Sequence, residues 1–261
     1  MNLESALKSA QRACQAAREV QLSHFGGPLK VTDKGLEGLV SEADIQSELT
    51  ITSLLKKDFP DVPVYGEEDV FQKKTALSKT SWVVDPLDGT TNYIYGLPIY
   101  CISIGLQIDG EVVLGVVDVP PWNRQYTAIK GEGAFLNGKP IHVSERKQIS
   151  NSVLATGFHP GDKESLSHQI QIFSQLVANS RAVRRAGAAA LDLCLVAEGV
   201  FDAFWESDLK PWDVAAGSLL VQEAGGVVST YQGTPFQIEE RSIIASSPEI
   251  FSQIVATTKK I

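Results

Sequence analysis

Two aspartates directly after a strongly apolar segment are the first residues in this chain whose types and spacing suit chemistry. Trp82-Val83-Val84 predicts a buried strand, and Asp85 and Asp88 follow it at once. Pro86 fixes its own φ and restricts Asp85 to extended backbone, so the chain leaves the strand in a set direction. Gly89 and the hydroxyl residues after it are typical of a turn into a short helix. Such an arrangement can bind divalent cations through its carboxylates and an anion through free N–H groups.

Three further acids hold comparable positions. Glu67 follows a short predicted strand, whereas Asp213 and Asp44 stand in the first turns of predicted helices. Taken alone, Glu67 fits a solvated turn, Asp213 fits a helix dipole, and Asp44 fits a capping box with Ser41. The shared placement of Glu67, Asp85, Asp88 and Asp213 at strand ends and helix starts favours one common site for these four acids instead. A set of oxygen ligands without a Cys/His cluster indicates Mg²⁺ or Mn²⁺ rather than Zn²⁺.

The charge balance also favours cations. The chain has a formal net charge of −8, so handling a phosphate ester would require cations to offset the repulsion. Four clustered carboxylates and a phosphate dianion carry about −6, which three divalent ions would neutralise. The same acidity argues against a nucleic-acid partner, because no basic stripe exists to meet a phosphate backbone.

Other features of the composition indicate where the protein works. No apolar run approaches membrane-spanning length, and the first residues lack the basic and apolar regions of a signal peptide. Cys14, Cys101 and Cys194 are scattered in apolar settings, which predicts buried thiols in a reducing compartment. We therefore expect a cytoplasmic protein without a membrane partner.

The elements that must position these acids form an α/β protein of two closely packed parts. Residues 1–147 predict an α+β subdomain, in which two helices cover an antiparallel sheet and most metal ligands reside. Asp109-Gly110 predicts a hairpin in that sheet. In residues 148–261 strands and helices alternate, which predicts an α/β subdomain with a mixed or parallel sheet. The apolar spacing of the second helix predicts an inner face made of Ile45, Leu49, Thr52, Leu55 and Phe59.

Two motifs carry a family resemblance. WVVDPLDGTTNYIY (Trp82–Tyr95) and WDVAAGSLLVQEAGG (Trp212–Gly226) resemble the two signatures of the inositol monophosphatase family, with Gly66-Glu67-Glu68 as a third element. Their order and spacing match that family over essentially the whole chain. The resemblance implies a layered α-β-α-β-α sandwich of the inositol monophosphatase/fructose-1,6-bisphosphatase type. It also implies a lithium-sensitive phosphomonoesterase, usually a homodimer, with two or three Mg²⁺ per active site and Mn²⁺ as a substitute.

The resemblance further implies roles for individual residues. Thr90, paired with Asp44, would orient or activate the attacking water, and Glu67 would belong to the catalytic group. Lys34 matches a lysine of a mobile active-site loop. The metal ligands would be Glu67, Asp85, the Leu87 carbonyl, Asp88 and Asp213. The phosphate-binding residues would be Gly89, Thr90 and Thr91. The residues facing the sugar or cyclitol would be Asp88, Gly187, Ala189, Glu206 and Asp213.

Two positions depart from the family pattern. Ala188 stands where animal members have Thr, and Gly38 replaces an acid that is common in the Lys34 loop. Both departures concern substrate contacts and a third metal ion, and neither touches the two-metal core.

The motifs predict direct hydrolysis of a small phosphomonoester, first of all inositol monophosphate. Fructose 1,6-bisphosphate, histidinol phosphate or a broad mixture of substrates are the alternatives. An aspartyl-phosphate phosphatase fits less well, since Asp85 and Asp88 are three residues apart rather than two. Nucleotide 3′-phosphatases of the same superfamily typically have Lys where this chain has Thr91. An alternative of another class is a regulatory binding protein that retains the fold.

Overall fold

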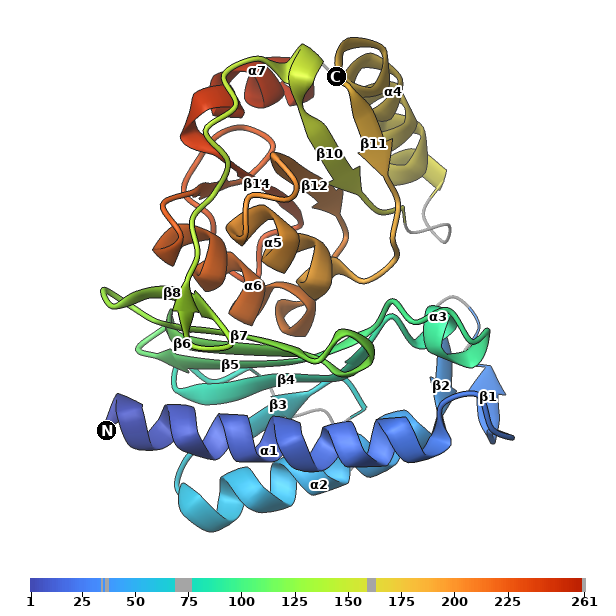
Figure 1. The fold of residues 1–261 in the computed structure, drawn as a ribbon, viewed down its shortest axis with the longest axis vertical. Helices are drawn as coiled ribbons and strands as arrows, with labels where there is room; N and C mark the ends of the chain where they lie inside the picture. The colour runs from blue at the N-terminus through green and yellow to red at the C-terminus, as the bar shows by residue number, and fades with distance from the viewer. Residues whose placement is uncertain (34, 36–37, 69–76, 159–162, 260–261) are drawn as a thin grey trace.

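Five layers of helices and sheets make up the molecule (Figure 1). The structure, a computed structural model, describes residues 1–33, 35, 38–68, 77–158 and 163–259. Two long helices cover the outer face of a seven-stranded sheet, two helices lie between this sheet and a five-stranded one, and two more cover the far side. The layered α-β-α-β-α sandwich predicted from the sequence is confirmed. The helices are α1 (Leu3–His24), α2 (Glu42–Asp58), α3 (Thr90–Ile94), α4 (Lys163–Asn179), α5 (Ala189–Ala197), α6 (Pro211–Glu223) and α7 (Pro248–Thr258).

The seven-stranded sheet has the order β3-β4-β5-β6-β7-β8-β9. Its pairs are antiparallel, as expected, except that β3 and β4 run parallel. A parallel pair requires a long crossover, which residues 67–80 supply. The strands are β3 (Val64–Gly66), β4 (Ser81–Asp88), β5 (Cys101–Ile108), β6 (Glu111–Val119), β7 (Arg124–Ile129), β8 (Gly133–Leu136) and β9 (Lys139–Pro140). Because β3 and β4 run parallel, Glu67, which follows β3, and Asp85 of β4 lie side by side, directly after the paired residues Gly66 and Val84.

Strand β4 is longer than the sequence predicts, because it continues through Pro86 to Asp88. Its register against β5 shifts between Asp85 and Asp88, as in a β-bulge. A bulge accommodates proline and re-aims side chains, so both aspartates lie within the strand rather than after it.

The second sheet is mixed, with the order β11-β10-β12-β14-β13. Strand β10 pairs in parallel with β11 and β12, whereas β14 is antiparallel to β12 and β13. The strands are β10 (Val153–Thr156), β11 (Ala182–Arg184), β12 (Ala203–Ser207), β13 (Val227–Ser229) and β14 (Ser242–Ser246). The two sheets thus come from either side of residue 147, and the division into subdomains 1–147 and 148–261 stays a prediction. Among the described helices, none is long and apolar enough to cross a membrane.

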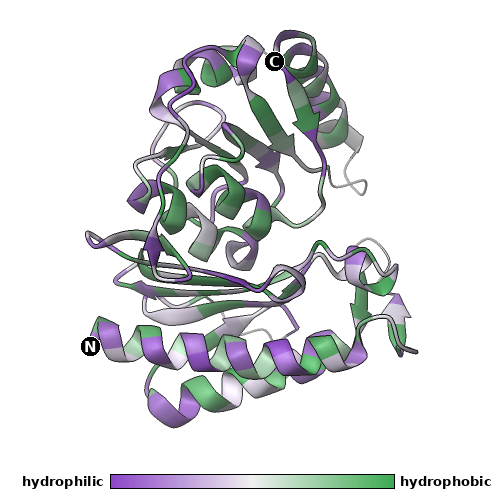
Figure 2. Cartoon of the chain, viewed as in Figure 1, coloured by the Kyte–Doolittle hydropathy of each residue, from purple (hydrophilic) through white to green (hydrophobic). Residues whose placement is uncertain are grey.

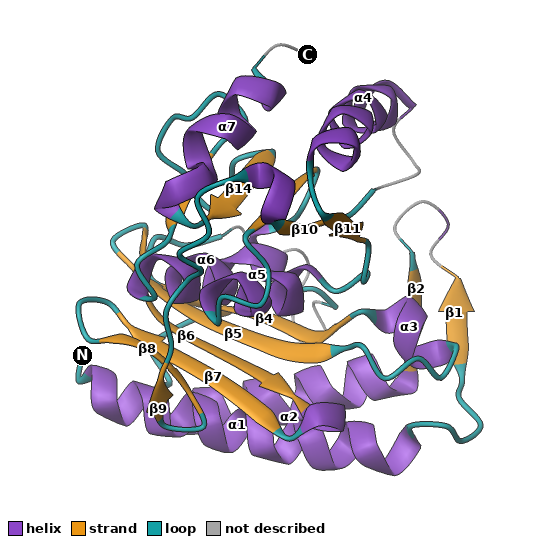
Figure 3. Ribbon diagram, turned by 45° about the horizontal axis from the view of Figure 1, so that its top comes forward, coloured by secondary structure: helices purple, strands orange, loops and turns teal. Residues whose placement is uncertain are grey.

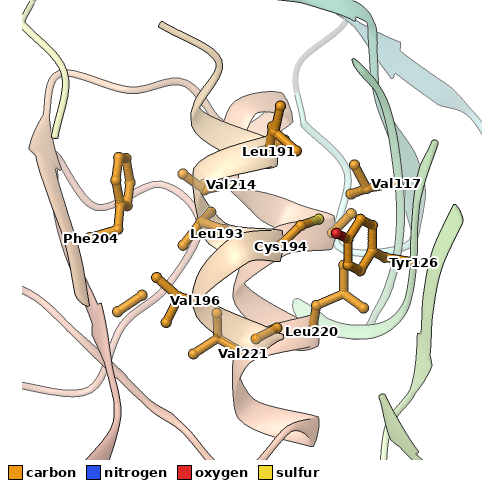
Figure 4. Packing of buried hydrophobic residues seen from close by; sticks show 14 of the residues in the cluster. Val117, Tyr126, Leu191, Leu193, Cys194, Val196, Phe204, Val214, Leu220 and Val221 are labelled. Atoms are coloured by element: carbon orange, nitrogen blue, oxygen red, sulfur yellow. The ribbon is translucent and has the colours of Figure 1, made fainter. Parts of the chain in front are cut away.

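The middle layer joins the two sheets through one hydrophobic core. All nine residues of α5 are buried, and its side chains lie between Phe204 of one sheet and Val117 and Tyr126 of the other (Figure 4). Figure 2 shows α5 as mainly hydrophobic, whereas α1 carries both hydrophobic and hydrophilic residues. An α-helix that is apolar on all sides belongs in a protein interior, whereas α1 buries only one face.

Helix α6 approaches the seven-stranded sheet closely, because glycines face it. An added Cβ on Gly115 would lie 2.8 Å from the Ala216 carbonyl oxygen, and one on Gly105 would lie 2.9 Å from the Ala215 Cβ. Any larger residue at these positions would push α6 outwards. The start of α6, which carries Asp213, is therefore held against the sheet that carries Asp85.

One prediction about packing is wrong. Ile45 of α2 is 39% exposed, whereas Asp44 and Glu48 are buried. The helix is thus rotated relative to the predicted inner face, although Thr52 and Leu55 are buried as predicted. Polar partners at the inner end of α2 explain the rotation, because they satisfy the two buried carboxylates.

A small two-stranded sheet flanks the end of the large sheet. It consists of β1 (Val31–Asp33) and β2 (Leu39–Ser41), and β2 contacts α3. Figure 3 shows these three elements together at one end of the molecule. Lys34, predicted to belong to an active-site loop, lies outside the described residues. Two short 3-10 helices, η2 (Pro120–Trp122) and η3 (Ile149–Asn151), complete the described elements.

Candidate active site

Three of the predicted carboxylates meet where β3, β4 and α6 converge. Glu67 is fixed through its backbone N–H, which donates to the Val84 carbonyl at 3.2 Å. Its carboxyl group hydrogen-bonds to Asp85, which also hydrogen-bonds to Asp213. Asp85 in addition accepts the Leu87 N–H at 3.0 Å. The parallel register of β3 and β4 is thus what brings Glu67 to the motif of Asp85.

Asp213 reaches this group from the first turn of α6. Its Oδ2 accepts the Lys210 N–H at 2.7 Å, so the residue also caps the helix. The preceding Trp212 packs against Tyr65 of β3, with ring centroids 5.3 Å apart. The capping role and the site role of Asp213 are therefore compatible.

Asp88 contacts the start of α5 as well as lying near the other acids. Its carboxylate accepts the N–H groups of Ala189 at 3.2 Å and Ala190 at 2.8 Å. The N-cap residue of α5, Ala188, has no side-chain oxygen, so Asp88 supplies the missing cap from another element. The Cys101 thiol, one of the three buried free cysteines, donates to Asp88 at 3.5 Å.

The proximity of these groups changes their acidities. Burial raises the pKa of Asp88 to about 6 and that of Asp213 to about 7, and for Asp213 the charge of Asp88 adds to the effect. Burial and neighbouring carboxylates raise the pKa of Glu67 and of Asp85 well above their usual ranges. Clustered carboxylates without a counter-charge hold their protons in this way.

The donor set of the cluster fits hard divalent cations. Its side chains offer only carboxylate oxygens, which Mg²⁺ prefers. Within the described ranges, no three His, Cys, Asp or Glu side chains could hold a metal ion as they stand. Instead, Asp85 is hydrogen-bonded to Glu67 and to Asp213, and the raised pKa values of the three carboxyl groups favour bound protons. The side chains would therefore have to reorient as a cation displaces those protons, and the ligand roles stay predictions.

Thr90 and Asp44, predicted as partners from the sequence, are in contact. Thr90 Oγ1 lies 2.8 Å from Asp44 Oδ1 and 3.0 Å from the Leu87 carbonyl oxygen. Asp44 Oδ2 accepts the N–H of Ser41 at 2.8 Å and its hydroxyl at 2.6 Å, which confirms the capping box. Burial raises the pKa of Asp44, although the bonds from Ser41 and Thr90 oppose this. The aspartate therefore caps α2 with one oxygen and meets Thr90 with the other.

The predicted phosphate-binding residues follow at the start of α3. Gly89 has a φ of 93°, and an added Cβ would lie 2.8 Å from the Ile99 carbonyl oxygen, so only glycine fits. Thr91 is exposed. The phosphate-binding role of Gly89, Thr90 and Thr91 stays a prediction.

The predicted substrate contacts come from the second half of the chain. Gly187 and Ala189 lie at the start of α5, beside Asp88. Asn92 ties this segment to the aspartate motif, because its Nδ2 donates to the Ala186 carbonyl at 2.9 Å and to the Ile99 carbonyl at 2.8 Å.

Glu206 lies near the end of β12, with its carboxylate against Gly157. An added Cβ on Gly157 would lie 2.1 Å from Glu206 Oε2, so this position admits no side chain while Glu206 keeps its place. Burial first, and then the charges of Asp192 and Asp213, raise the pKa of Glu206 well above its usual range. Gly157 was not predicted, and no local pattern marks it.

Sequence reasoning also missed Gln21. The Gln21 Nε2 donates to the Pro86 carbonyl at 2.6 Å, and the backbone carbonyl of Gln21 accepts the Tyr93 hydroxyl at 2.6 Å. The first helix thereby braces the bulge between Asp85 and Asp88. The spacing of Ala17 and Gln21 on the inner face of that helix was the signal that would have found it.

Comparisons with known proteins show which proteins the chain resembles. A family model described as the inositol monophosphatase family matches residues 2–261. The chain is 38% identical over 260 residues to the Nus factor SuhB of Pseudomonas aeruginosa, covering 98% of this chain and 96% of that protein. It is 38% identical to the fructose-1,6-bisphosphatase/inositol-1-monophosphatase of Aquifex aeolicus, and the match covers 99% of this chain and 97% of that protein.

Solved structures show the same likeness. The extragenic suppressor protein suhB of Bartonella henselae superposes with a TM-score of 0.90 at 33% identity, covering 98% of each chain. An IMPase of Thermotoga maritima superposes with a TM-score of 0.87 at 32% identity, covering 95% of this chain and 94% of that one.

Proposed function

Because the chain belongs to the inositol monophosphatase family and is a phosphatase of that family, we propose that it hydrolyses a small sugar or cyclitol phosphomonoester with Mg²⁺. The first candidate substrate is inositol monophosphate. The observation that carries the proposal is the meeting of Glu67, Asp85 and Asp213 beside the hydrogen-bonded pair of Thr90 and Asp44.

The chain's own oxygen atoms would hold the cations. The ligands would be the carboxylates of Glu67, Asp85, Asp88 and Asp213 and the Leu87 carbonyl. When bound, Mg²⁺ would offset the charge of the phosphate, favour ionisation of the attacking water and stabilise the departing alkoxide. The raised pKa values of Asp88 and Asp213 support this assignment, since a divalent cation would stabilise the charged carboxylates that burial disfavours.

The attack itself needs a water molecule held in one orientation. With its own proton directed to Asp44 Oδ1, Thr90 Oγ1 offers lone pairs to that water and can take its proton. Asp44 accepts the proton that Thr90 gives up, and burial suits it to this because its pKa is raised. Hydrolysis by this route forms no covalent phospho-enzyme.

The remaining residues bind the substrate. Gly89, Thr90 and Thr91 offer N–H or hydroxyl donors to the phosphate oxygens. Gly187, Ala189 and Glu206 would contact the sugar or cyclitol, and the Glu206 carboxylate would accept hydrogen bonds from its hydroxyl groups. Phosphate release should be measured from inositol 1-phosphate, fructose 1,6-bisphosphate and histidinol phosphate, with Mg²⁺ and with excess EDTA.

The expected result is Mg²⁺-dependent release, fastest from inositol 1-phosphate and inhibited by millimolar Li⁺. Asp213→Asn should abolish it, whereas Asp109→Asn, a matched change at an exposed hairpin turn, should not. Full activity in excess EDTA would contradict the proposal.

A second candidate rests on the names of relatives. The Pseudomonas aeruginosa relative is called a Nus factor, and two Neisseria meningitidis relatives, each 38% identical, are called putative Nus factors. This chain would then act through a partner, with or without hydrolysis. If a Thr90→Ala protein whose melting curve shows that it is folded restores growth to a host that lacks the protein, hydrolysis is not the required activity.

We also propose a homodimer, on the family resemblance. Sedimentation should then give twice the chain mass of 28.2 kDa.

A further inference from the structure

Glu48 of α2 is a buried acid that the proposed mechanism does not use. Its side chain is 2% exposed, and it lies one helical turn after Asp44. Residues four apart share one face of a helix, so Glu48 faces the large sheet as Asp44 does. A carboxylate in such a position must be matched by specific partners.

The partners of Glu48 lie on both sides of Glu67. Glu48 Oε2 accepts the N–H of Glu68 at 2.8 Å. On the other side, an added Cβ on Gly66 would lie 2.6 Å from Oε2 and 2.7 Å from Cδ. The carboxylate is therefore packed directly against Gly66 while it holds the backbone at Glu68.

Within the described residues, the segment before Glu67 is held by its pairing with β4 and by the packing of Tyr65 against Trp212. Strand β3 has three residues and stands at the edge of its sheet, paired only with β4. The bond from the Glu67 N–H to the Val84 carbonyl, at 3.2 Å, is the last of that pairing. Beyond it, the Glu68 N–H donates to Glu48, which adds a contact on the far side of Glu67.

We propose that Glu48 is a positioning residue for Glu67. By holding the backbone before and after Glu67, it directs that carboxylate towards Asp85 and Asp213 and so sets the affinity of the site for Mg²⁺. Carboxylate-to-N–H bonds are among the stronger hydrogen bonds, which suits them to fixing the end of a short edge strand. The inference rests on the proposed function, because it takes Glu67 as a metal ligand.

Gly66 and the Glu48 carboxylate can be substituted separately, which gives two independent tests of their contact. Glu48→Ala removes the acceptor, and Glu48→Gln keeps an oxygen for the Glu68 N–H. Gly66→Ala leaves the acceptor but inserts a methyl group where the carboxylate lies, and the φ of Gly66 is not in the left-handed region. Ser47→Ala is the control, because Ser47 is a neighbouring buried residue of α2 whose hydroxyl has no partner within the described structure.

The measurement is Mg²⁺ binding to each variant by calorimetry, with melting temperatures in EDTA as a separate record of stability. Glu48→Ala and Gly66→Ala should each raise the dissociation constant for Mg²⁺ about tenfold or more, which is the usual scale for groups that orient metal ligands. Glu48→Gln should lose much less Mg²⁺ affinity, and Ser47→Ala should bind Mg²⁺ as the wild type does. In the Glu48→Ala background, Gly66→Ala should have little further effect, because the clash is gone.

The inference is overturned if Glu48→Ala lowers the melting temperature in EDTA but leaves the Mg²⁺ dissociation constant unchanged, because Glu48 then serves stability alone. If Glu48→Ala fails to fold, unchanged Mg²⁺ binding by Gly66→Ala overturns it equally. A wild-type protein that binds no Mg²⁺ would instead overturn the proposed function, and the inference with it.

Discussion

Thr90 has two acceptors for one proton. Asp44 Oδ1 and the Leu87 carbonyl lie at 2.8 and 3.0 Å from its hydroxyl oxygen, and only one of them can receive the proton at a time. If a cation engages the Leu87 carbonyl, the proton is left to Asp44. The hydroxyl would then be oriented for catalysis by the same event that completes the site.

Thr90→Ala should therefore lower kcat by about 10²-fold, the scale for losing a proton-transfer group, and leave Mg²⁺ affinity nearly unchanged. Thr90→Ser keeps the hydroxyl and should retain most of the activity. Steady-state kinetics and Mg²⁺ titrations of both variants check this. Near wild-type kcat in Thr90→Ala would mean that the hydroxyl only supports the turn.

Gly157 gives a second residue-scale prediction. Gly157→Ala should displace the Glu206 carboxylate, since the new Cβ would lie 2.1 Å from its Oε2. We expect KM to rise for inositol phosphate and the preference among sugar phosphates to change, with Mg²⁺ dependence intact. Gly27→Ala, at a glycine outside the site, is the control. Equal loss on every substrate would mean that Gly157 and Glu206 only support the fold.

Helix α5 depends on a cap from another element. Its first N–H groups are satisfied by Asp88 of β4, and its own N-cap residue is an alanine. The acid that would bind a cation therefore also holds the helix whose start would face the substrate. The Asp88 side chain therefore has a structural role, as the cap of α5, and a proposed catalytic role, as a cation ligand.

Two substitutions separate these roles. In EDTA, Asp88→Ala should lower the free energy of unfolding by about 1–2 kcal/mol, the usual effect of losing an N-cap. Asp88→Asn keeps one acceptor oxygen and removes the repulsion with Asp213, so it should be at least as stable as the wild type. Neither variant should gain melting temperature from Mg²⁺ as the wild type does. An Asp88→Asn protein as unstable as Asp88→Ala would show that the cap requires the charge.

Asp192, also on α5, is a buried acid whose Oδ1 has no hydrogen-bond partner in the described structure. Burial first, and then the charge of Asp88, raise its pKa well above its usual range, whereas Arg185 acts in the opposite direction. Because the folded-state pKa exceeds the unfolded one, the wild type loses stability as pH rises above about 4, where the unfolded chain ionises.

Asp192→Asn removes this titration. Its melting temperature should match the wild type near pH 4 and exceed it by a few degrees at pH 8. Melting curves of both proteins across that range test the prediction, with the exposed-turn variant Asp109→Asn as control. A difference that stays constant with pH would show that ionisation of Asp192 is not its cause.

At the scale of the whole molecule, the candidate ligands come from two layers. Glu67 and Asp85 belong to the seven-stranded sheet, whereas Asp213 belongs to α6, between the two sheets. A cation bound to all three would link these layers and would be released on unfolding.

Mg²⁺ should accordingly stabilise the folded protein by about 1.4 kcal/mol at a concentration ten times its dissociation constant. For a chain of this size, that corresponds to a rise of roughly 3–6 °C in melting temperature. Melting curves in EDTA and in Mg²⁺, at ionic strength matched with NaCl, provide the measurement. An unchanged melting temperature at millimolar Mg²⁺ would contradict a shared cation site.

The sequence alone determined the elements and the residues of the candidate site. The Asp109-Gly110 hairpin, the last helix starting at Pro248 and the pairing of Thr90 with Asp44 were all predictable. The hairpin and the start of the last helix depend on local signals, such as turn chemistry and apolar periodicity, which a sequence displays directly. The pairing of Thr90 with Asp44 was predicted from the family resemblance instead.

Only the tertiary structure decided how the acids are held. The parallel register of β3 and β4, the Asp88 cap on α5 and the packing of Glu48 against Gly66 left no local pattern. They join residues 18 to 102 positions apart, as in Val64 with Trp82 and Asp88 with Ala190. Such contacts depend on the packing of whole layers, because a buried polar group selects its partner by place in the fold and not by distance along the chain.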